Sequence, residues 1–265
     1  MNYRQLGKTG WKVSALSLGA SPLGGAFGPA DEKEGIRTVK TALEHGINFI
    51  DVAPFYGSTM AETILGKALH GVPRESFYIA TKVGRYGPEP KDFDFSKSRI
   101  IKSVDESLRR LKLSHIDLIQ CHDVEFAPRQ QLLNESLPAL AQLKTTGKVR
   151  HIGITAFPLE VLRQVAEKAH LDTVLSFCRY CLTDTTLVQL LPLFREKRIG
   201  IINASPFAMG LLTSKGPPPW HPAPADYRDA CARALEFCQK RRRELEKIAL
   251  QFAISHPGIS TTLVG

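Results

Sequence analysis

The feature that most constrains the fold is a regular alternation of short apolar runs with longer amphipathic stretches. The apolar runs are Val13–Gly19, Asn48–Ala53, Phe77–Val83, Ile116–His122, Val149–Thr155, Thr173–Cys178, Gly200–Ser205 and Ile259–Gly265. Several are hydrophobic almost throughout, which is typical of parallel strands covered by helices. Eight strands with helices between them predict an α/β fold, a closed (β/α)8 TIM barrel. The 265 residues are close to the roughly 250 of a typical barrel.

The stretches between the apolar runs carry helix signals. Ser96 and Asp184 are candidate N-caps, because each precedes a stripe of apolar residues at helical spacing. Gly46 and Gly147 stand where helices should end before the next strand. A doubly wound sheet is the alternative, but it usually has Gly-x-Gly-x-x-Gly after its first strand. Residues 19–25 lack that spacing, which favours the barrel.

The two ends of the sequence lead to further expectations. Tyr3–Leu6 and Lys12–Leu16 flank a Gly-rich turn, which predicts a β-hairpin that plugs the bottom of the barrel. No linker or low-complexity tract interrupts the chain, so residues 1–265 are expected to form one barrel domain. The sequence stops at the eighth predicted strand. The domain is therefore expected to be C-terminally short and to lack the helix after strand eight.

Composition narrows the class of protein. No apolar run approaches the roughly 20 residues of a membrane helix, and no signal peptide is recognisable, so we expect a cytoplasmic protein with no membrane partner. The net charge of +9 is scattered apart from Lys240–Arg243, interpreted as a solvated helix face rather than a nucleic-acid site. The five cysteines, including Cys178 and Cys181, are expected to be reduced thiols and to bind no metal.

Ionisable side chains gather at the ends of three neighbouring predicted strands. Asp51 ends the second strand and is followed by Tyr56, Lys82 lies at the end of the third strand, and His122 ends the fourth. Barrel enzymes place their chemistry at these carboxyl ends. Any one of these residues alone would be interpreted as structural. Together they predict a catalytic site.

These residue types suit proton transfer at an alcohol or a carbonyl. An ammonium such as Lys82 would stabilise a Tyr56 phenolate and lower the phenol pKa from its usual value of about 10. Asp51 would keep the ammonium charged, and His122 would hydrogen-bond the substrate oxygen. No Ser or Cys nucleophile with a paired base lies at these positions. Redox chemistry is therefore favoured over hydrolysis, and it requires a nicotinamide cofactor to carry the hydride.

At this point the sequence resembles the aldo-keto reductase superfamily along its whole length. The matching segments are Gly46–Asp51, Tyr56-Gly57, Ala61-Glu62, Leu65-Gly66, Gly147–Arg150 and Ile152–Ile154. Further segments resemble the branch of aldose 1-dehydrogenases, which oxidise sugars such as L-galactose at C1. They are Gly19–Gly24, Gly84–Tyr86, Cys121–Asp123, Ile201–Pro206, Ala208–Thr213, Gly216–Pro218 and Trp220–Pro222.

The resemblance implies roles for individual residues. It makes Asp51, Tyr56, Lys82 and His122 a catalytic tetrad in which Tyr56 transfers the proton. The implied cofactor, NAD or NADP, would be bound by Thr155, Ser205, Ala208, Gly210 and Leu212. From loop position, the substrate mouth is expected to include Phe27, Phe55 and Tyr86. Two features depart from many reductases of the superfamily: Thr155-Ala156 replaces a Ser-Asn pair, and Ala204 replaces an aromatic residue.

The resemblance thus implies an NAD(P)-dependent oxidoreductase that transfers a hydride between nicotinamide and an aldose or carbonyl substrate. Oxidation of a sugar such as L-galactose at C1 to a lactone is the expected reaction. The partners expected are a small-molecule sugar or carbonyl and, at most, a second copy in a weak homo-oligomer. Two alternatives stay open. One is a non-catalytic subunit that senses a nucleotide or binds a partner, and the other is an inactive truncated product.

Overall fold

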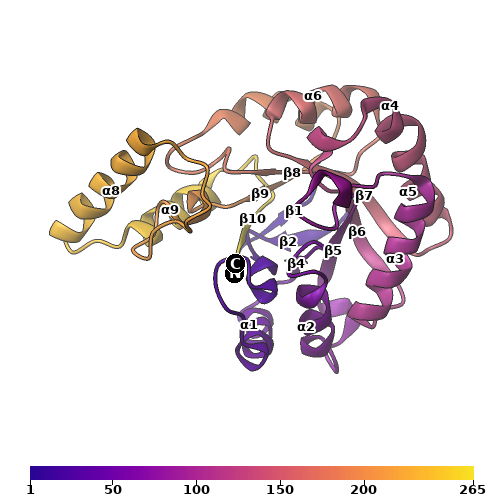
Figure 1. Cartoon of the computed structure of the whole chain (residues 1–265), viewed down its shortest axis with the longest axis horizontal. Coiled ribbons are helices and arrows are strands. Elements are labelled where there is room, and N and C mark those ends of the chain that lie inside the picture. Colours follow the sequence, from indigo (N-terminus) through magenta and orange to yellow (C-terminus); the bar gives the residue numbers. More distant parts are fainter.

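The computed structural model describes residues 1–265 and contains a closed barrel of eight parallel strands (Figure 1). The barrel strands are β3 (Leu16–Gly19), β4 (Phe49–Asp51), β5 (Tyr78–Val83), β6 (Ile116–Cys121), β7 (Val149–Ala156), β8 (Thr173–Phe177), β9 (Gly200–Ala204) and β10 (Thr261–Val264). They pair in sequence order, and β10 closes the barrel by pairing in parallel with both β9 and β3. The predicted barrel is therefore confirmed, with each of the eight predicted runs contributing one barrel strand.

Helices connect successive strands on the outside of the barrel (Figure 1). They are α1 (Glu32–Glu44), α2 (Met60–Ala68), α3 (Lys97–Leu111), α4 (Arg129–Gln131), α5 (Leu137–Thr145), α6 (Leu159–Lys168), α7 (Leu191–Glu196), α8 (Ala225–Lys240) and α9 (Leu245–Ser255). The pair α8 and α9 joins β9 to β10 and extends to one side of the barrel. No helix of the chain is long and apolar enough to span a membrane.

A short antiparallel hairpin precedes the barrel, as the sequence predicts. Its strands are β1 (Tyr3–Gln5) and β2 (Lys12–Ser14). The apolar run that begins at Val13 is divided here, because the chain leaves the hairpin and joins the barrel at Ala15. The Ala15 N–H donates to the carbonyl of Asn2, and the Ala15 carbonyl accepts from the N–H of Thr262. One continuous run of apolar residues thus serves two sheets.

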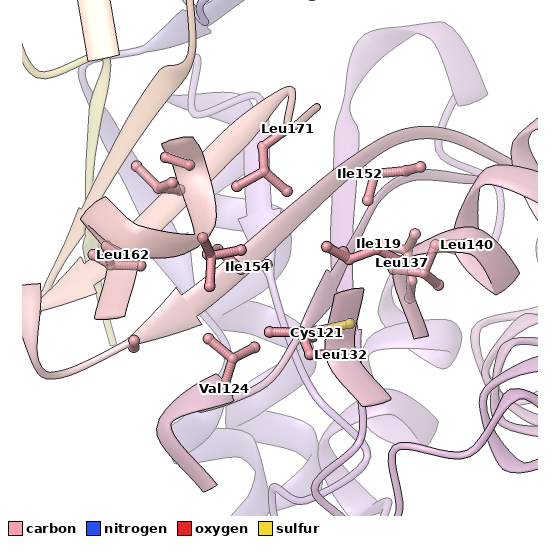
Figure 2. Close-up of a cluster of buried hydrophobic side chains, with 14 of the residues drawn as sticks. Ile119, Cys121, Val124, Leu132, Leu137, Leu140, Ile152, Ile154, Leu162 and Leu171 are labelled. Carbon is pink, nitrogen blue, oxygen red and sulfur yellow. The ribbon is translucent and has the colours of Figure 1, made fainter. Parts of the chain in front are cut away.

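The hairpin packs its apolar residues against the lower interior of the barrel. Leu6, Trp11 and Val13 form one cluster with inward-facing strand residues such as Phe49 and Leu118. A second and larger cluster lies outside the strands, between β6, β7 and the helices that cover them (Figure 2). The hairpin therefore closes the end of the barrel at which the strands begin. The open end is the one at which the strands finish.

Helix boundaries follow the predicted signals, with one exception. Ser96 is the N-cap of α3, where its side chain accepts a hydrogen bond from the backbone of Arg99 at 3.4 Å. Gly46 and Gly147 have φ of 84° and 76°, and both lie just after helices, in the left-handed conformation that glycine adopts without steric cost.

The exception is the helix expected after Asp184. A 3-10 helix, η6 (Thr186–Leu190), comes first, and the α-helix α7 begins only at Leu191 with a proline in its first turn. The Asp184 carboxylate accepts from the N–H of Thr186 at 2.8 Å and closes a local turn. A carboxylate that bonds two residues ahead competes with helix formation. Pro192, at the start of α7, has no N–H for a helix running through it.

Candidate active site

The barrel topology brings the four residues of the predicted catalytic set together at the open end. Asp51 is the last residue of β4, Lys82 lies near the end of β5, and His122 directly follows β6. Tyr56 lies in the loop after β4, and its ring packs edge-to-face against His122 with centroids 5.8 Å apart. Residues far apart in sequence meet here because parallel strands present their carboxyl ends on the same side.

Lys82 is the centre of the cluster. Its side chain is 1% exposed, and its ammonium donates to the Asp51 carboxylate, to the Val52 carbonyl at 2.9 Å and to the Tyr56 hydroxyl at 3.1 Å. An ammonium has three N–H donors, so all of them are used. The Tyr56 oxygen therefore accepts a hydrogen bond from Lys82, and its own O–H can donate to a ligand bound at the open end of the barrel.

The electrostatics of this cluster differ in one respect from the sequence-based expectation. Burial raises the pKa of the Tyr56 hydroxyl above its usual value, and this effect exceeds the opposing effect of the Lys82 ammonium. The predicted effect of Lys82 is present, since its charge and its hydrogen bond lower the pKa of Tyr56, but burial outweighs it and the net shift is upward. The reason is that desolvation disfavours the phenolate and the nearby Asp51 carboxylate adds repulsion.

Lys82 itself stays charged. Burial lowers its pKa, but the charges of Asp51 and Tyr56 and their hydrogen bonds raise it, and the net shift is upward. Burial also raises the pKa of Asp51 against the opposing effect of Lys82. The ion pair is thus maintained in a dry environment, where the loss of either partner would leave an uncompensated buried charge.

His122 is a neutral imidazole in this setting. Burial lowers its pKa to about 3, although the nearby Asp123 carboxylate opposes the shift. Its Nδ1 is buried without a hydrogen-bond partner, whereas Nε2 lies 3.8 Å from Oδ2 of Asp123. A neutral ring with one nitrogen facing the mouth can hydrogen-bond a substrate oxygen without adding charge.

Gln120 also belongs to the cluster but is missing from the predicted set. Its side-chain amide donates to Oδ2 of Asp51 at 2.9 Å, and its Oε1 is buried without a partner. Gln120 lies two residues before His122 on β6, so both point to the same face of the strand. A polar residue within an apolar strand, two positions before a candidate histidine, was the sequence signal that could have identified it.

A second missed pair lies next to His122. Arg85, two residues after the end of β5, donates from Nη1 to Oδ2 of Asp123 at 2.5 Å. Asp123 has a φ of 49°, so its backbone is in the left-handed region that non-glycine residues rarely adopt. Thr155 holds it there, because the hydroxyl of Thr155 accepts from the Asp123 N–H at 2.8 Å and donates to Oδ1 at 3.1 Å.

The predicted cofactor residues fall into two groups. Thr155 is 1% exposed and commits its hydroxyl to Asp123. Ser205, Ala208 and Gly210 lie in the loop after β9 with φ of 57°, 47° and 102°. Ala208 and the nearby Leu212 are buried beneath α8 and α9, so their side chains face the protein. This loop can offer a ligand chiefly its backbone, and the assignment of these residues to a cofactor stays a prediction.

The predicted substrate residues are not all close to the cluster. Phe55 is close, since its ring centroid is 6.0 Å from that of Tyr56 and 6.1 Å from that of His122. Phe27 is 41% exposed and lies 6.1 Å from the Trp220 ring, between two loops of the mouth. Tyr86 instead packs beneath Arg99 of α3, whose guanidinium carbon is 3.8 Å from its ring centroid. Only Phe55 directly borders the ionisable groups.

The cysteines form no disulfide, and all five are free thiols. Burial raises the pKa of Cys178 to about 12, so this thiol is protonated at neutral pH. No group of three or more His, Cys, Asp or Glu side chains is arranged to hold a metal ion.

Comparison with known proteins gives a consistent assignment. Residues 15–265 match the aldo/keto reductase family. L-galactose dehydrogenase of Arabidopsis thaliana is 46% identical over 99% of this chain and 83% of its own length. D-arabinose 1-dehydrogenase of Saccharomyces cerevisiae is 34% identical over 92% of this chain and 76% of its length. A holo-form aldo-keto reductase of Bacillus halodurans has a similar structure, with a TM-score of 0.82 and 31% identity over 99% of this chain and 85% of that chain.

Proposed function

This chain belongs to the aldo/keto reductase family of oxidoreductases, and on that basis we propose that it is an NAD(P)-dependent aldose 1-dehydrogenase. Its substrate would be a sugar such as L-galactose, oxidised at C1 to a lactone. The identity to an L-galactose dehydrogenase over nearly the whole chain supports the substrate class. The observation that carries the chemistry is the hydrogen bond from Lys82 Nζ to the Tyr56 hydroxyl at 3.1 Å.

Tyr56 is the proton-transferring residue in this proposal. In sugar oxidation its phenolate form takes the proton of the C1 hydroxyl, and Lys82 stabilises the phenolate through their hydrogen bond. In carbonyl reduction the neutral phenol donates its proton to the carbonyl oxygen. Burial raises the pKa of Tyr56, so the phenol dominates at neutral pH. Oxidation is therefore expected to accelerate as the pH rises.

His122 orients the reacting oxygen. Its Nδ1 is buried without a partner and its Nε2 lies 3.8 Å from the Asp123 carboxylate, and in this proposal the neutral ring carries its proton on Nε2. From that position the N–H donates to the oxygen on C1. Because the pKa of His122 is lowered to about 3, this role does not change over the physiological pH range.

A nicotinamide dinucleotide, when bound, supplies the hydride acceptor that none of these side chains can provide. The residues present fit such a group. In the loop after β9 the N–H groups of Ala208 and Gly210 already donate to the carbonyls of Ser205 and Phe207. This leaves the N–H of Met209, whose φ is 50°, as a group that could meet a bound phosphate. Phe177 and Ala204, at the ends of β8 and β9, give the upper barrel an apolar wall for a flat ring.

The replacement Tyr56→Phe tests the proposal. It removes the hydroxyl and keeps the ring, so we expect turnover of L-galactose to fall by about 10³-fold or more, with dinucleotide affinity nearly unchanged. Tyr180→Phe is the matched control, because Tyr180 stacks on Phe252 with centroids 5.2 Å apart, away from the cluster. Turnover by Tyr56→Phe at the wild-type rate would refute the assignment.

Tryptophan fluorescence can measure the affinities for NAD and NADP separately. Of the two tryptophans, Trp11 is buried in the hairpin plug and Trp220 is 57% exposed in the loop region after β9. Quenching on dinucleotide addition is expected to disappear in Trp220→Phe. A wild-type protein that binds a dinucleotide but oxidises no aldose would instead favour a nucleotide-sensing subunit.

A further inference from the structure

The ion pair between Arg85 and Asp123 has unused hydrogen-bonding capacity at the mouth. Arg85 donates from Nη1 to Asp123 and from Nε to the Gly87 carbonyl at 3.4 Å, while its Nη2 makes no hydrogen bond within the protein. The Arg85 side chain is 22% exposed. The pair therefore presents a donor and a carboxylate acceptor together, at the edge of the site.

The pair is also fixed in position. Thr155 bonds both the backbone and the carboxylate of Asp123. The Arg85 guanidinium lies over two aromatic rings, with its carbon 4.0 Å from the Phe55 centroid and 5.3 Å from the Phe93 centroid. A guanidinium stacked on aromatic rings loses little further freedom when it binds a ligand. A pair of charged side chains held in place in this way is suited to binding a ligand.

Its location defines what it can recognise. Oδ2 of Asp123 lies 3.8 Å from Nε2 of His122, the atom that holds the C1 oxygen in the proposed function. Neighbouring hydroxyl groups on a sugar ring lie within hydrogen-bonding distance of one another. A sugar whose C1 oxygen is bonded to His122 can therefore place the adjacent C2 hydroxyl against the Asp123–Arg85 pair, beside the hydrogen bond that joins the two side chains.

We infer that the Arg85–Asp123 pair is a subsite for the hydroxyl group next to the reacting carbon, and that it selects hydroxylated aldoses over carbonyl compounds that lack this group. The Asp123 carboxylate accepts a hydrogen bond from the C2 hydroxyl, and Nη2 of Arg85 donates a hydrogen bond to the oxygen of that hydroxyl. Phe55 lies beneath the guanidinium and beside His122, where it can face the sugar ring. The inference rests on the proposed function for the position of C1.

The test compares two substrates that differ only at C2, L-galactose and 2-deoxy-L-galactose, at saturating dinucleotide. Hydrogen bonds to charged groups contribute enough to predict that the wild type prefers L-galactose by about 10- to 100-fold in kcat/KM. Asp123→Asn and Arg85→Gln are expected to lower kcat/KM for L-galactose and to change that for the 2-deoxy sugar by less than about threefold. The preference would then nearly disappear.

A matched control is available in the loops that follow β7 and β8. Arg179 pairs with Asp184 at 3.0 Å and stacks on Phe157 at 3.9 Å, the same arrangement without a neighbouring catalytic histidine. Asp184→Asn should leave the preference between the two sugars unchanged. Equal losses on both sugars in Asp123→Asn and Arg85→Gln would overturn the inference, because they would show that the pair merely orients His122.

Calorimetric titration of the two sugars separates this inference from the proposed function. If the wild type oxidises neither sugar but binds L-galactose more tightly than its 2-deoxy analogue, and Asp123→Asn removes the difference, the subsite stands and the proposed reaction fails. If the wild type neither binds nor distinguishes the two sugars, the subsite fails as well. Thermal unfolding of each variant verifies that the compared proteins are folded.

Discussion

The two ends of the barrel both contain buried carboxylates paired with basic side chains, but the carboxylates have different partners. At the closed end, where the barrel strands begin and the hairpin packs, Oδ2 of Asp117 accepts from the backbone N–H of Ile79 at 2.9 Å and from Arg74 at 2.5 Å. Asp172 likewise bonds a backbone N–H and Lys144. At the open end, Asp51 accepts only from side chains, those of Lys82 and Gln120. The carboxylates of the closed end bond backbone N–H groups and so connect neighbouring strands. Asp51 at the open end bonds only other side chains, which can move when a ligand binds.

Backbone strain is distributed in the same way. Ten non-glycine residues have positive φ. Seven of them lie in loops at the carboxyl ends of strands, namely Ser58, Thr59, Asp123, Cys178, Ser205, Ala208 and Met209. Strained backbone persists only where the surrounding structure maintains it, and it is common at functional sites. The comparison indicates that stability is built at the closed end and chemistry at the open end.

The largest expected effect contrasts two lysines. Lys82→Met should lower kcat/KM by about 10³-fold, because it removes the donor to Tyr56 that favours proton transfer. Lys144→Met removes the lysine that bonds Asp172 at 3.0 Å at the closed end, and should leave kcat/KM unchanged. Steady-state kinetics normalised to folded protein make the measurement. Similar losses in both variants would remove the distinction between the two ends.

The next effect concerns stability alone. Asp117→Asn should lower the free energy of unfolding by about 2 kcal/mol, because it removes the charge of a buried carboxylate that bonds the partly exposed Arg74. The exposed pair Asp105–Lys148 is the control, and Asp105→Asn should cost less than about 1 kcal/mol. Urea unfolding gives both values. A change in kcat of the folded Asp117→Asn protein would contradict a purely structural role for this end.

Acid sensitivity should also differ between the ends. Burial lowers the pKa of His122 to about 3, so between about pH 6.5 and 3 the unfolded chain binds a proton that the folded protein does not. The stability contribution is present above about pH 6.5 and decreases by roughly 1.4 kcal/mol per pH unit below it. His122→Gln should remove this slope, as measured by urea unfolding at pH 7 and pH 5.

His115, at the closed end, provides the comparison for that slope. Burial lowers its pKa as well, helped by Arg74 and Arg150, but its position is far less enclosed. His115→Gln should therefore flatten the pH dependence less than His122→Gln. The opposite ranking would show that the buried histidine of the mouth is protonated in the folded protein.

The smallest effect tests backbone strain. Arg198, between α7 and β9 at the closed end, and Met209, in the loop after β9, have φ of 53° and 50°. Replacement of either by glycine should relieve up to about 1 kcal/mol of strain in the folded state. Only Met209→Gly should also raise the Kd for the dinucleotide, severalfold, because it loosens the loop. Fluorescence titration of both variants distinguishes the two positions.

Several elements were predictable from the residues alone. The helix cap at Ser96, the terminating glycines Gly46 and Gly147 and the eight strand positions depend on local spacing. The helix expected from Asp184 failed because its carboxylate bonds Thr186 locally and Pro192 delays the α-helix. In the site, Asp51, Lys82 and His122 could be predicted because each lies at or next to the end of its strand, where barrel topology must bring such residues together.

The residues that were missed depend on contacts that no spacing specifies. Arg85 meets Asp123 only because the loops after β5 and β6 are adjacent. The role of Thr155 in holding Asp123 likewise requires the neighbouring position of β7. The direction of the Tyr56 pKa shift could not be predicted either, because it is the sum of opposing effects of burial and charge.

The sequence by itself determined the barrel, the hairpin plug and the candidate catalytic residues, since alternating hydrophobicity fixes the element order and strand ends share one side. The tertiary structure alone decided which side chains are dry, which donors are already used and which remain free for a ligand. The physical reason is that desolvation and hydrogen-bond geometry depend on atoms from many strands at once. Periodicity records only which face of its own element a residue occupies.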